Sequence, residues 1–233
     1  MNKKSVLIVV AHPDDEILGA GATIHKLSSI GVEINCLILS GHVGARSTKV
    51  SKEGVLKNIK TSGDLVGIND HTIGFFKNIE LNTYPHLEIV QFIEDALKKY
   101  QPTTIITHHA SDINDDHVIT SKACLVAARL YQRQDTTSQI HNILTMEIPS
   151  STDWAYQSSN PYQANYYCHI DKDNLEKKID ALRAYEDVLR SEPHPRSIAA
   201  ISSLAITRGS QCGNNLAESF QSVYSLLLEE SVK

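Results

Sequence analysis

The chain has 233 residues, of which 41% are hydrophobic, so residues 1–233 can bury a substantial core in a single domain rather than in two small ones. Lys and Arg total 22 and Asp and Glu total 27, which gives a formal net charge of −5. This mildly acidic balance argues against the broad basic face that binding to nucleic acid or to a membrane surface requires.

Apolar and amphipathic runs alternate through the first two thirds of the chain. They predict strands at residues 6–10, 33–39, 72–76, 103–107 and 143–148, and helices at 14–29, 52–65, 86–100 and 117–131. Such alternation indicates right-handed crossovers and a mainly parallel sheet covered on both faces, which is a Rossmann-like three-layer α/β sandwich. In that architecture the ligand site lies at the carboxyl ends of the strands.

The last third of the chain is less regular. Residues 149–161 are rich in Ser, Asn, Tyr and Pro, and indicate an active-site loop or a domain elaboration. A helix predicted at 175–189 should end before the prolines of 192–196. The apolar segment 198–206 favours a helix, and 220–228 favours a final strand or helix.

The first group of chemically informative residues is AHPDDE, at 11–16, where the first strand becomes a helix. A dinucleotide-binding protein would have a glycine-rich turn here, whereas this chain has an imidazole and three carboxylates. We expect His12 and Asp15 to point at one spot above the sheet, with Asp14 approaching from the side. Because a catalytic zinc ion usually takes three protein ligands and an open position, a third ligand should come from another strand end.

The second group is THHASDINDDH, at 107–117, which follows the fourth predicted strand and contains three histidines and three aspartates. In a doubly wound sheet the first and fourth strands can be neighbours at the switch point, so their loops would meet. His117 is our predicted third ligand. Asp115 or Asp116 alone would be an ordinary helix N-cap. Two such groups at corresponding strand ends favour a metal site.

AHPDDE after a first strand and DINDDH after a later one resemble the LmbE/PIG-L family of zinc-dependent N-deacetylases. The resemblance covers nearly the whole chain, and IPSSTDW (148–154) and PHPRS (193–197) are similar to a bacterial branch associated with surface-glycan or nucleotide-sugar clusters. It implies an LmbE-like domain that hydrolyses the acetamide of an N-acetylated, GlcNAc-like sugar, whether free, nucleotide-linked, lipid-linked or glycan-linked. The products would be acetate and an amino sugar.

The resemblance also implies roles for individual residues. The matching positions are the zinc ligands His12, Asp15 and His117, the general base Asp14, and the supporting carboxylates Glu16 and Asp116. Zn²⁺ is the implied cofactor, although iron or cobalt would also suit two histidines and one carboxylate. Asp14 would take a proton from the water that attacks the acetamide carbonyl.

Asn114 is a departure from the family pattern, because many relatives have a histidine three residues before the final ligand. Asparagine donates a hydrogen bond to an oxyanion but does not transfer a proton at neutral pH. We therefore predict that Asn114 supports the oxyanion. The proton for the leaving nitrogen would come from Asp14, His109 or His194.

Recognition of the sugar requires polar groups and a flat apolar surface. The predicted substrate contacts are Arg46, Asp112, Trp154, His194 and Arg196, with His42 and Tyr156 as further candidates. Arginine suits a phosphate or a pair of hydroxyls. The alternatives are an ordinary packed aromatic for Trp154 and surface salt bridges for the arginines, although the prolines around His194 fix the presentation of its segment.

Two other functions are compatible with parts of the sequence. A zinc amidase acting on a non-sugar or thiol-conjugate amide would share the metal site and differ only in its substrate loops. A non-catalytic binding module would have lost the base or a ligand, and here all of them are present.

The N-terminal apolar run ends in charge soon after Val10, so it does not predict a secretory signal, and no apolar run is as long as a membrane span. The cysteines at 36, 124, 168 and 212 have no CxxC spacing and predict neither a disulfide framework nor a thiolate metal site. These features favour the cytoplasm. The family resemblance is compatible with a homo-oligomer, such as a trimer or hexamer.

Overall fold

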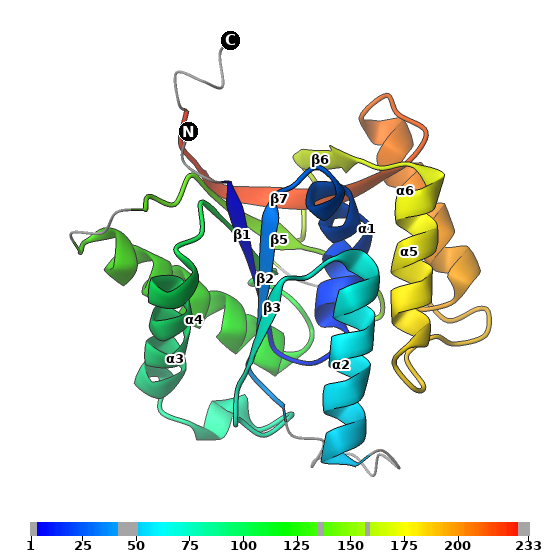
Figure 1. The fold of residues 1–233 in the computed structure, drawn as a ribbon. Helices are drawn as coiled ribbons and strands as arrows, with labels where there is room; N and C mark the ends of the chain where they lie inside the picture. The colour runs from blue at the N-terminus through cyan, green and yellow to red at the C-terminus, as the bar shows by residue number, and fades with distance from the viewer. Residues whose placement is uncertain (1–3, 42–50, 135–137, 157–158, 228–233) are drawn as a thin grey trace.

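The computed structural model describes residues 4–41, 51–134, 138–156 and 159–227, which form one seven-stranded sheet with helices on both faces (Figure 1). The strand order is β3-β2-β1-β4-β5-β7-β6. The parallel strands are β1 (Ser5–Val10), β2 (Glu33–Ile38), β3 (Asp70–Ile73), β4 (Thr104–His108) and β5 (Asn142–Met146). Strand β7 (Ala217–Ser225) is antiparallel to β5, and β6 (Tyr166–His169) is antiparallel to β7. The predicted mainly parallel α/β sandwich is therefore confirmed.

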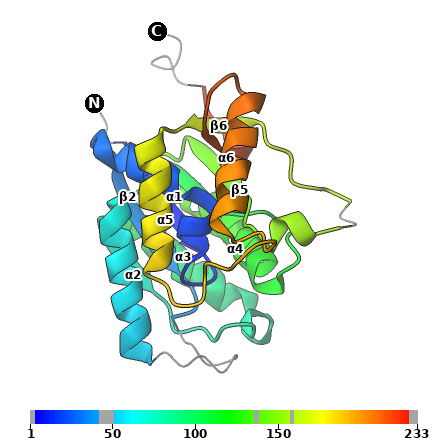
Figure 2. The ribbon, with the colours of Figure 1, turned by 90° about the vertical axis from the view of Figure 1, so that its right-hand side faces the viewer.

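Helices form a layer on each side of this sheet. One layer contains α1 (Asp15–Ser29), α2 (Lys52–Val66), α5 (Lys172–Arg183) and α6 (Ile198–Gln211); the other contains α3 (His86–Tyr100) and α4 (Asp115–Gln132) (Figures 1 and 2). Alternate side chains of β1 point to opposite layers: Val6 and Ile8 pack into the core cluster with α1 and α5, and Leu7 and Val9 into the cluster with α3 and α4. Burial on both faces explains the uninterrupted apolar run of this strand.

Strand β1 lies between β2 and β4, and both neighbours run parallel to it. From β1 the sheet continues to β2 and β3 on one side and to β4 and β5 on the other. The strands β1 and β4 therefore flank the switch point, as the sequence analysis expected. The segments that lead from β1 into α1 and from β4 into α4 therefore meet at the carboxyl end of the sheet. Two short 3₁₀ helices, η1 (Leu81–Thr83) and η2 (Thr152–Trp154), lie in other loops of the chain.

Several element boundaries differ from the predictions, and one strand was missed. The third strand is Asp70–Ile73, earlier than the predicted 72–76, and α5 ends at Arg183 rather than at 189. The final element is a strand. Strand β6 was not predicted, because its four residues show no alternation of apolar and polar side chains. Among the residues that the structure describes, no helix combines the length and apolarity needed to cross a membrane.

A buried ion pair joins α5 to β7 and α1. Lys178 Nζ donates to Glu218 Oε1 at 2.6 Å and to the Leu18 carbonyl at 2.8 Å, and Glu218 Oε2 accepts from the Thr23 N–H at 2.7 Å. Both charged residues are 6% exposed. Removing one partner of such a pair leaves the other charge buried without compensation.

We expect Lys178→Met to lower the free energy of unfolding by about 3–5 kcal/mol, measured by urea denaturation. The matched control is Lys60→Met, which removes the exposed ion pair between Lys60 and Asp64, whose nitrogen–oxygen distance is 2.8 Å. The control should lose less than about 1 kcal/mol, because solvent screens that pair. Equal losses in the two variants would show that burial does not increase the contribution of the Lys178–Glu218 pair to the free energy of unfolding.

Candidate metal centre and active site

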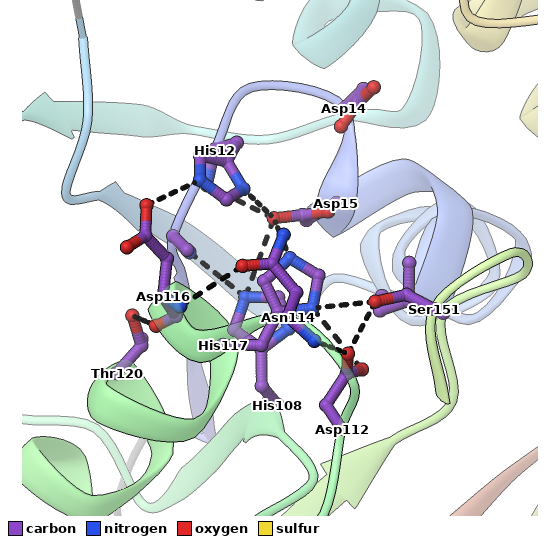
Figure 3. A network of polar contacts seen from close by, with 12 residues as sticks. His12, Asp14, Asp15, His108, Asp112, Asn114, Asp116, His117, Thr120 and Ser151 are labelled. Atoms are coloured by element: carbon purple, nitrogen blue, oxygen red, sulfur yellow. Dashed lines mark hydrogen bonds and ion pairs between the residues drawn. The ribbon is translucent and has the colours of Figure 1, made fainter. Parts of the chain in front are cut away.

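His12, Asp15 and His117 come together where β1 and β4 end (Figure 3). One nitrogen or oxygen of each side chain lies within 4.8 Å of the others. Asp15 Oδ2 is 3.2 Å from His12 Nδ1 and 3.2 Å from His117 Nε2. Asp15 and His117 are buried, and His12 is half-buried.

The donor atoms of this cluster fit a divalent cation. His117 Nε2 is buried and makes no hydrogen bond to any described residue, although it faces the Asp15 carboxylate. Two imidazole nitrogens and one carboxylate oxygen around a common point are the ligand set of many catalytic zinc sites. The sequence prediction of these three residues as one group agrees with their placement, and their role as ligands remains a proposal.

A second carboxylate holds each imidazole from behind. His12 Nε2 is 3.0 Å from Asp116 Oδ2, and His117 Nδ1 is 3.2 Å from Asp112 Oδ2. These contacts favour the tautomers that direct the lone pairs of His12 Nδ1 and His117 Nε2 toward Asp15. Asp116 is fixed in turn, since Oδ2 accepts from the Ile79 N–H at 2.6 Å.

The position of Asp112 differs from its predicted role as a substrate contact. Its side chain is fully buried against His117. Oδ2 accepts from Thr152 Oγ1 at 2.7 Å, and Oδ1 accepts from Ser151 Oγ. A carboxylate enclosed in this way orients an imidazole and has no free oxygen for a ligand. The IPSSTDW loop therefore supports the His12–Asp15–His117 cluster through Ser151 and Thr152.

The surrounding carboxylates favour positive charge on both imidazoles. Burial opposes the charged form of His117, but Asp15 and Asp112 outweigh burial and raise its pKa to about 10. Burial likewise opposes charge on His12, whose pKa is raised to about 9 by its hydrogen bonds to Asp116 and Asp15. The carboxylates therefore stabilise positive charge at this position, and a metal ion bound there would displace the ring protons.

His108 is a buried residue to which the sequence analysis gave no role. Its ring stacks on His117, with ring centroids 3.9 Å apart and an interplanar angle of 15°. Its Nε2 accepts from the Ala11 N–H at 2.9 Å, and burial lowers its pKa to about 3. A neutral, fixed ring under His117 limits the movement of that imidazole. As the last residue of β4, it could have been identified from the direction of its side chain.

Asp14 has an unusual backbone conformation at the start of α1. Its φ is 99°, a left-handed value that costs free energy for residues other than glycine. Glu16 Oε2 accepts from the Asp14 N–H at 3.1 Å, and Glu16 Oε1 accepts from the Tyr185 hydroxyl at 2.6 Å. Burial raises the pKa of Asp14 to about 7, and the neighbouring Asp15 adds to this effect. Glu16 thus holds the backbone of Asp14, which agrees with its expected supporting position.

Arg196 contacts the predicted base directly. Its Nη1 lies 3.3 Å from Asp14 Oδ2, and its Nε donates to Ser150 Oγ at 2.8 Å. Ser150 itself has a left-handed φ of 67°. The sequence analysis predicted a substrate contact at Arg196, whereas the structure places its guanidinium between the IPSSTDW loop and Asp14.

Asn114 has the geometry of a helix cap with a free amide nitrogen. Its Oδ1 accepts from the Asp116 N–H at 3.0 Å at the start of α4, so its Nδ2 remains available to a ligand. This arrangement is compatible with the predicted oxyanion contact. His109 lies elsewhere: its ring is edge-on to Tyr162, and it lines neither of the two cavities next to the His12–Asp15–His117 cluster.

Two adjoining cavities open beside the His12–Asp15–His117 cluster. The first, of about 250 Å³, is lined by Asp14, Asn114, Tyr185 and the three candidate ligands, among others. The second, of about 530 Å³, is lined by Trp154 and His194, among others, and shares Ile79, Asn114 and Arg196 with the first. Tyr156 lines neither cavity, and His42 and Arg46 lie outside the described residues.

Comparisons with known proteins agree on one family. The family described as "PIG-L: GlcNAc-PI de-N-acetylase" matches residues 7–128. The chain is 28% identical over 161 residues to an Escherichia coli protein described as "Uncharacterized deacetylase YaiS". The aligned region covers 64% of this chain and 76% of that protein. It is 22% identical over 231 residues to the diacetylchitobiose deacetylase of Thermococcus kodakarensis, covering 97% and 85% of the two chains.

The fold is also found among solved structures. The N,N′-diacetylchitobiose deacetylase from Pyrococcus horikoshii, solved with an inhibitor, superposes with a TM-score of 0.76 at 21% identity and covers 96% of this chain and 85% of its own. At that identity the likeness establishes the fold, whereas activity has to be argued from the site.

Proposed function

The chain belongs to the PIG-L family of de-N-acetylases, and on that basis we propose that it is a metal-dependent hydrolase that removes the acetyl group from an N-acetylated sugar. The observation that carries the proposal is the His12–Asp15–His117 cluster with the Asp14 carboxylate in the same cavity. These groups are suited to the hydrolysis of an unreactive amide, because they combine ligands for a Lewis acid with a separate base.

We propose zinc as the resident metal, held by His12 Nδ1, His117 Nε2 and the Asp15 carboxylate. Zinc bound there would supply Lewis acidity toward water and toward the amide carbonyl. Asp112 and Asp116 support this assignment, because each fixes the ring nitrogen that points away from the cluster.

Asp14 is the proposed proton acceptor. It is not part of the ligand cluster, and the Arg196 guanidinium at 3.3 Å orients its carboxylate. The amide nitrogen of Asn114 would donate to the oxygen of the substrate carbonyl as negative charge develops there. Asp14 would then return the proton to the leaving nitrogen, because it lines the cavity of the ligand cluster, whereas neither His109 nor His194 does.

Acetate release by zinc-loaded protein tests the proposal. The panel contains N-acetylglucosamine, N,N′-diacetylchitobiose, a sugar nucleotide carrying an N-acetyl group, and a non-sugar N-acetyl amide. We expect release from at least one sugar and none from the non-sugar amide. Release from the non-sugar amide alone would favour the amidase alternative and contradict the sugar assignment.

A further prediction concerns the carboxylate behind His12. Asp116→Asn removes the charge that holds His12 Nε2 and should weaken zinc binding by about 10- to 100-fold, measured by competition with a chromophoric chelator. Asp115→Asn is the matched control, since the exposed Asp115 precedes it in the first turn of α4. Equal dissociation constants for the two variants would contradict a supporting role for Asp116.

A further inference from the structure

The 530 Å³ cavity next to the His12–Asp15–His117 cluster has no role in the proposed chemistry. We propose that it binds a phosphate ester carried by the N-acetylated sugar, with Arg190 as the residue that selects the charge. The inference rests on the proposed function and names the class of substrate within it. Because the two cavities share Ile79, Asn114 and Arg196, one substrate can place its acetamide beside Asp14 and its substituent in the second cavity.

Arg190 provides a positive charge without an internal partner. Its guanidinium is exposed at the cavity and makes no hydrogen bond or ion pair with any residue that the structure describes. Its backbone N–H donates to the Arg196 carbonyl at 3.2 Å, which ties the position of Arg190 to the segment that contacts Asp14. The planar guanidinium binds phosphate oxygens through two parallel hydrogen bonds.

Two further side chains of the cavity have donors free. His194 Nδ1 accepts from the Arg196 N–H at 3.0 Å, so the neutral ring carries its hydrogen on Nε2 and offers it to a ligand. Asn114 Oδ1 is occupied by the Asp116 N–H, and one of its two amide hydrogens is assigned to the acetamide oxygen, so the other remains for the second cavity. An anion with several acceptor oxygens satisfies such a set of donors.

Some acceptors on the cavity wall are engaged by the protein itself. Asp116 Oδ2 contacts His12 Nε2 and the Ile79 N–H, and its Oδ1 accepts from the Leu81 N–H at 3.2 Å. The exposed Asp115 and Asn82 also line the described wall and keep acceptor oxygens free. The charge of Arg190, rather than a lack of acceptors, therefore favours an anion over a neutral sugar in this cavity.

Trp154 supplies a flat surface in the same cavity. Its side chain is 40% exposed, and its ring lies edge-on to His194 with centroids 6.1 Å apart. The exposed indole face is available to a ring linked to the phosphate. A phosphomonoester would leave this face uncovered, whereas a diphosphate carrying a nucleoside would cover it.

The test compares substrates that differ in charge at the same position. N-acetylglucosamine 1-phosphate, a uridine diphosphate conjugate of N-acetylglucosamine and the neutral methyl glycoside are each assayed for kcat/KM, with N,N′-diacetylchitobiose as a larger neutral substrate. We expect the phosphorylated substrates to exceed the neutral ones by about tenfold or more, because hydrogen bonds to a charged group are worth that much. Arg190→Gln should remove this advantage by raising KM for the phosphorylated substrates. It should leave kcat/KM for the methyl glycoside within about twofold of the wild-type value.

Arg190→Lys, which keeps the charge, should restore part of the preference, and Arg129→Gln at the far end of α4 is the matched control without effect. The preference should also weaken as salt is added. Equal kcat/KM for charged and neutral sugars, or an equal loss for both in Arg190→Gln, would overturn the inference and leave deacetylation intact. A higher kcat/KM for diacetylchitobiose would assign the cavity to a second neutral sugar.

Binding is measured separately, so that the two proposals fail in different ways. Dissociation constants of N-acetylglucosamine 1-phosphate and of the methyl glycoside are obtained by calorimetry with zinc-loaded protein in which Asp14→Asn blocks turnover. Tighter binding of the phosphate without acetate release from any wild-type reaction would refute the deacetylase and retain the anion site. Equal binding would refute the anion site.

Discussion

Asp14→Asn is expected to lower kcat for acetate release by about a thousandfold, which is the usual contribution of a positioned general base. The amide of asparagine cannot accept a proton, whereas its size and shape match those of the carboxylate. Asparagine also tolerates the left-handed φ of 99° better than most residues, so the backbone at the start of α1 should be preserved. We expect KM to change little, because Asp14 acts on water rather than on the sugar.

Asp187→Asn is a matched control for this substitution. Asp187 is a second aspartate with a left-handed φ, of 61°, and it is exposed. The control should keep kcat within about twofold of the wild type, because the exposed Asp187 lines neither of the two cavities. The zinc content of both variants is measured alongside the rate. An Asp14→Asn enzyme with full zinc occupancy and a kcat within tenfold of the wild type would remove Asp14 from the role of base.

Local patterns in the sequence were sufficient to predict the parallel strands of the sheet, but not β6. The apolar runs at 6–10 and 103–107 became β1 and β4 because both faces of these strands are buried, and the helix at 86–100 was predicted with its observed bounds. The start of α4 was predicted two residues late, because a side-chain cap at Asn114 begins the helix at Asp115. The end of α5 was misplaced because the chain leaves the helix after Arg183, which brings Tyr185 to Glu16.

The grouping of the site was predictable for a different reason. His12, Asp15 and His117 come from two strand ends that the topology makes neighbours, so their meeting follows from strand order. The partners of Asp112 and Arg196 depend on the path of the IPSSTDW loop, which carries no periodic signal. Sequence reasoning gave Asp112 to the substrate, whereas in the structure its carboxylate contacts His117. Arg196 contacts Asp14 and also lines both cavities, so its predicted substrate contact stays a prediction.

Removal of the metal or of His117 is the second change with a large expected effect. Chelation of the wild type should abolish acetate release, and added zinc should restore it. His117→Ala should bind far less than the expected one ion per chain, measured by elemental analysis, because the two remaining residues do not replace a three-residue site. This variant should not regain activity with zinc. His109→Ala is the matched control, since His109 is buried near β4 but outside the cluster.

Thermal stability provides a reading of the same site that does not depend on activity. A ligand at about a thousand times its Kd stabilises the native state by about 4 kcal/mol, and for a chain of this size each kcal/mol shifts Tm by about 2–4 °C. Chelation should therefore lower the Tm of the wild type and of His109→Ala by about 8–16 °C and leave that of His117→Ala unchanged. A zinc-dependent Tm that persists in His117→Ala would place the metal elsewhere and dissociate it from the Asp14 carboxylate.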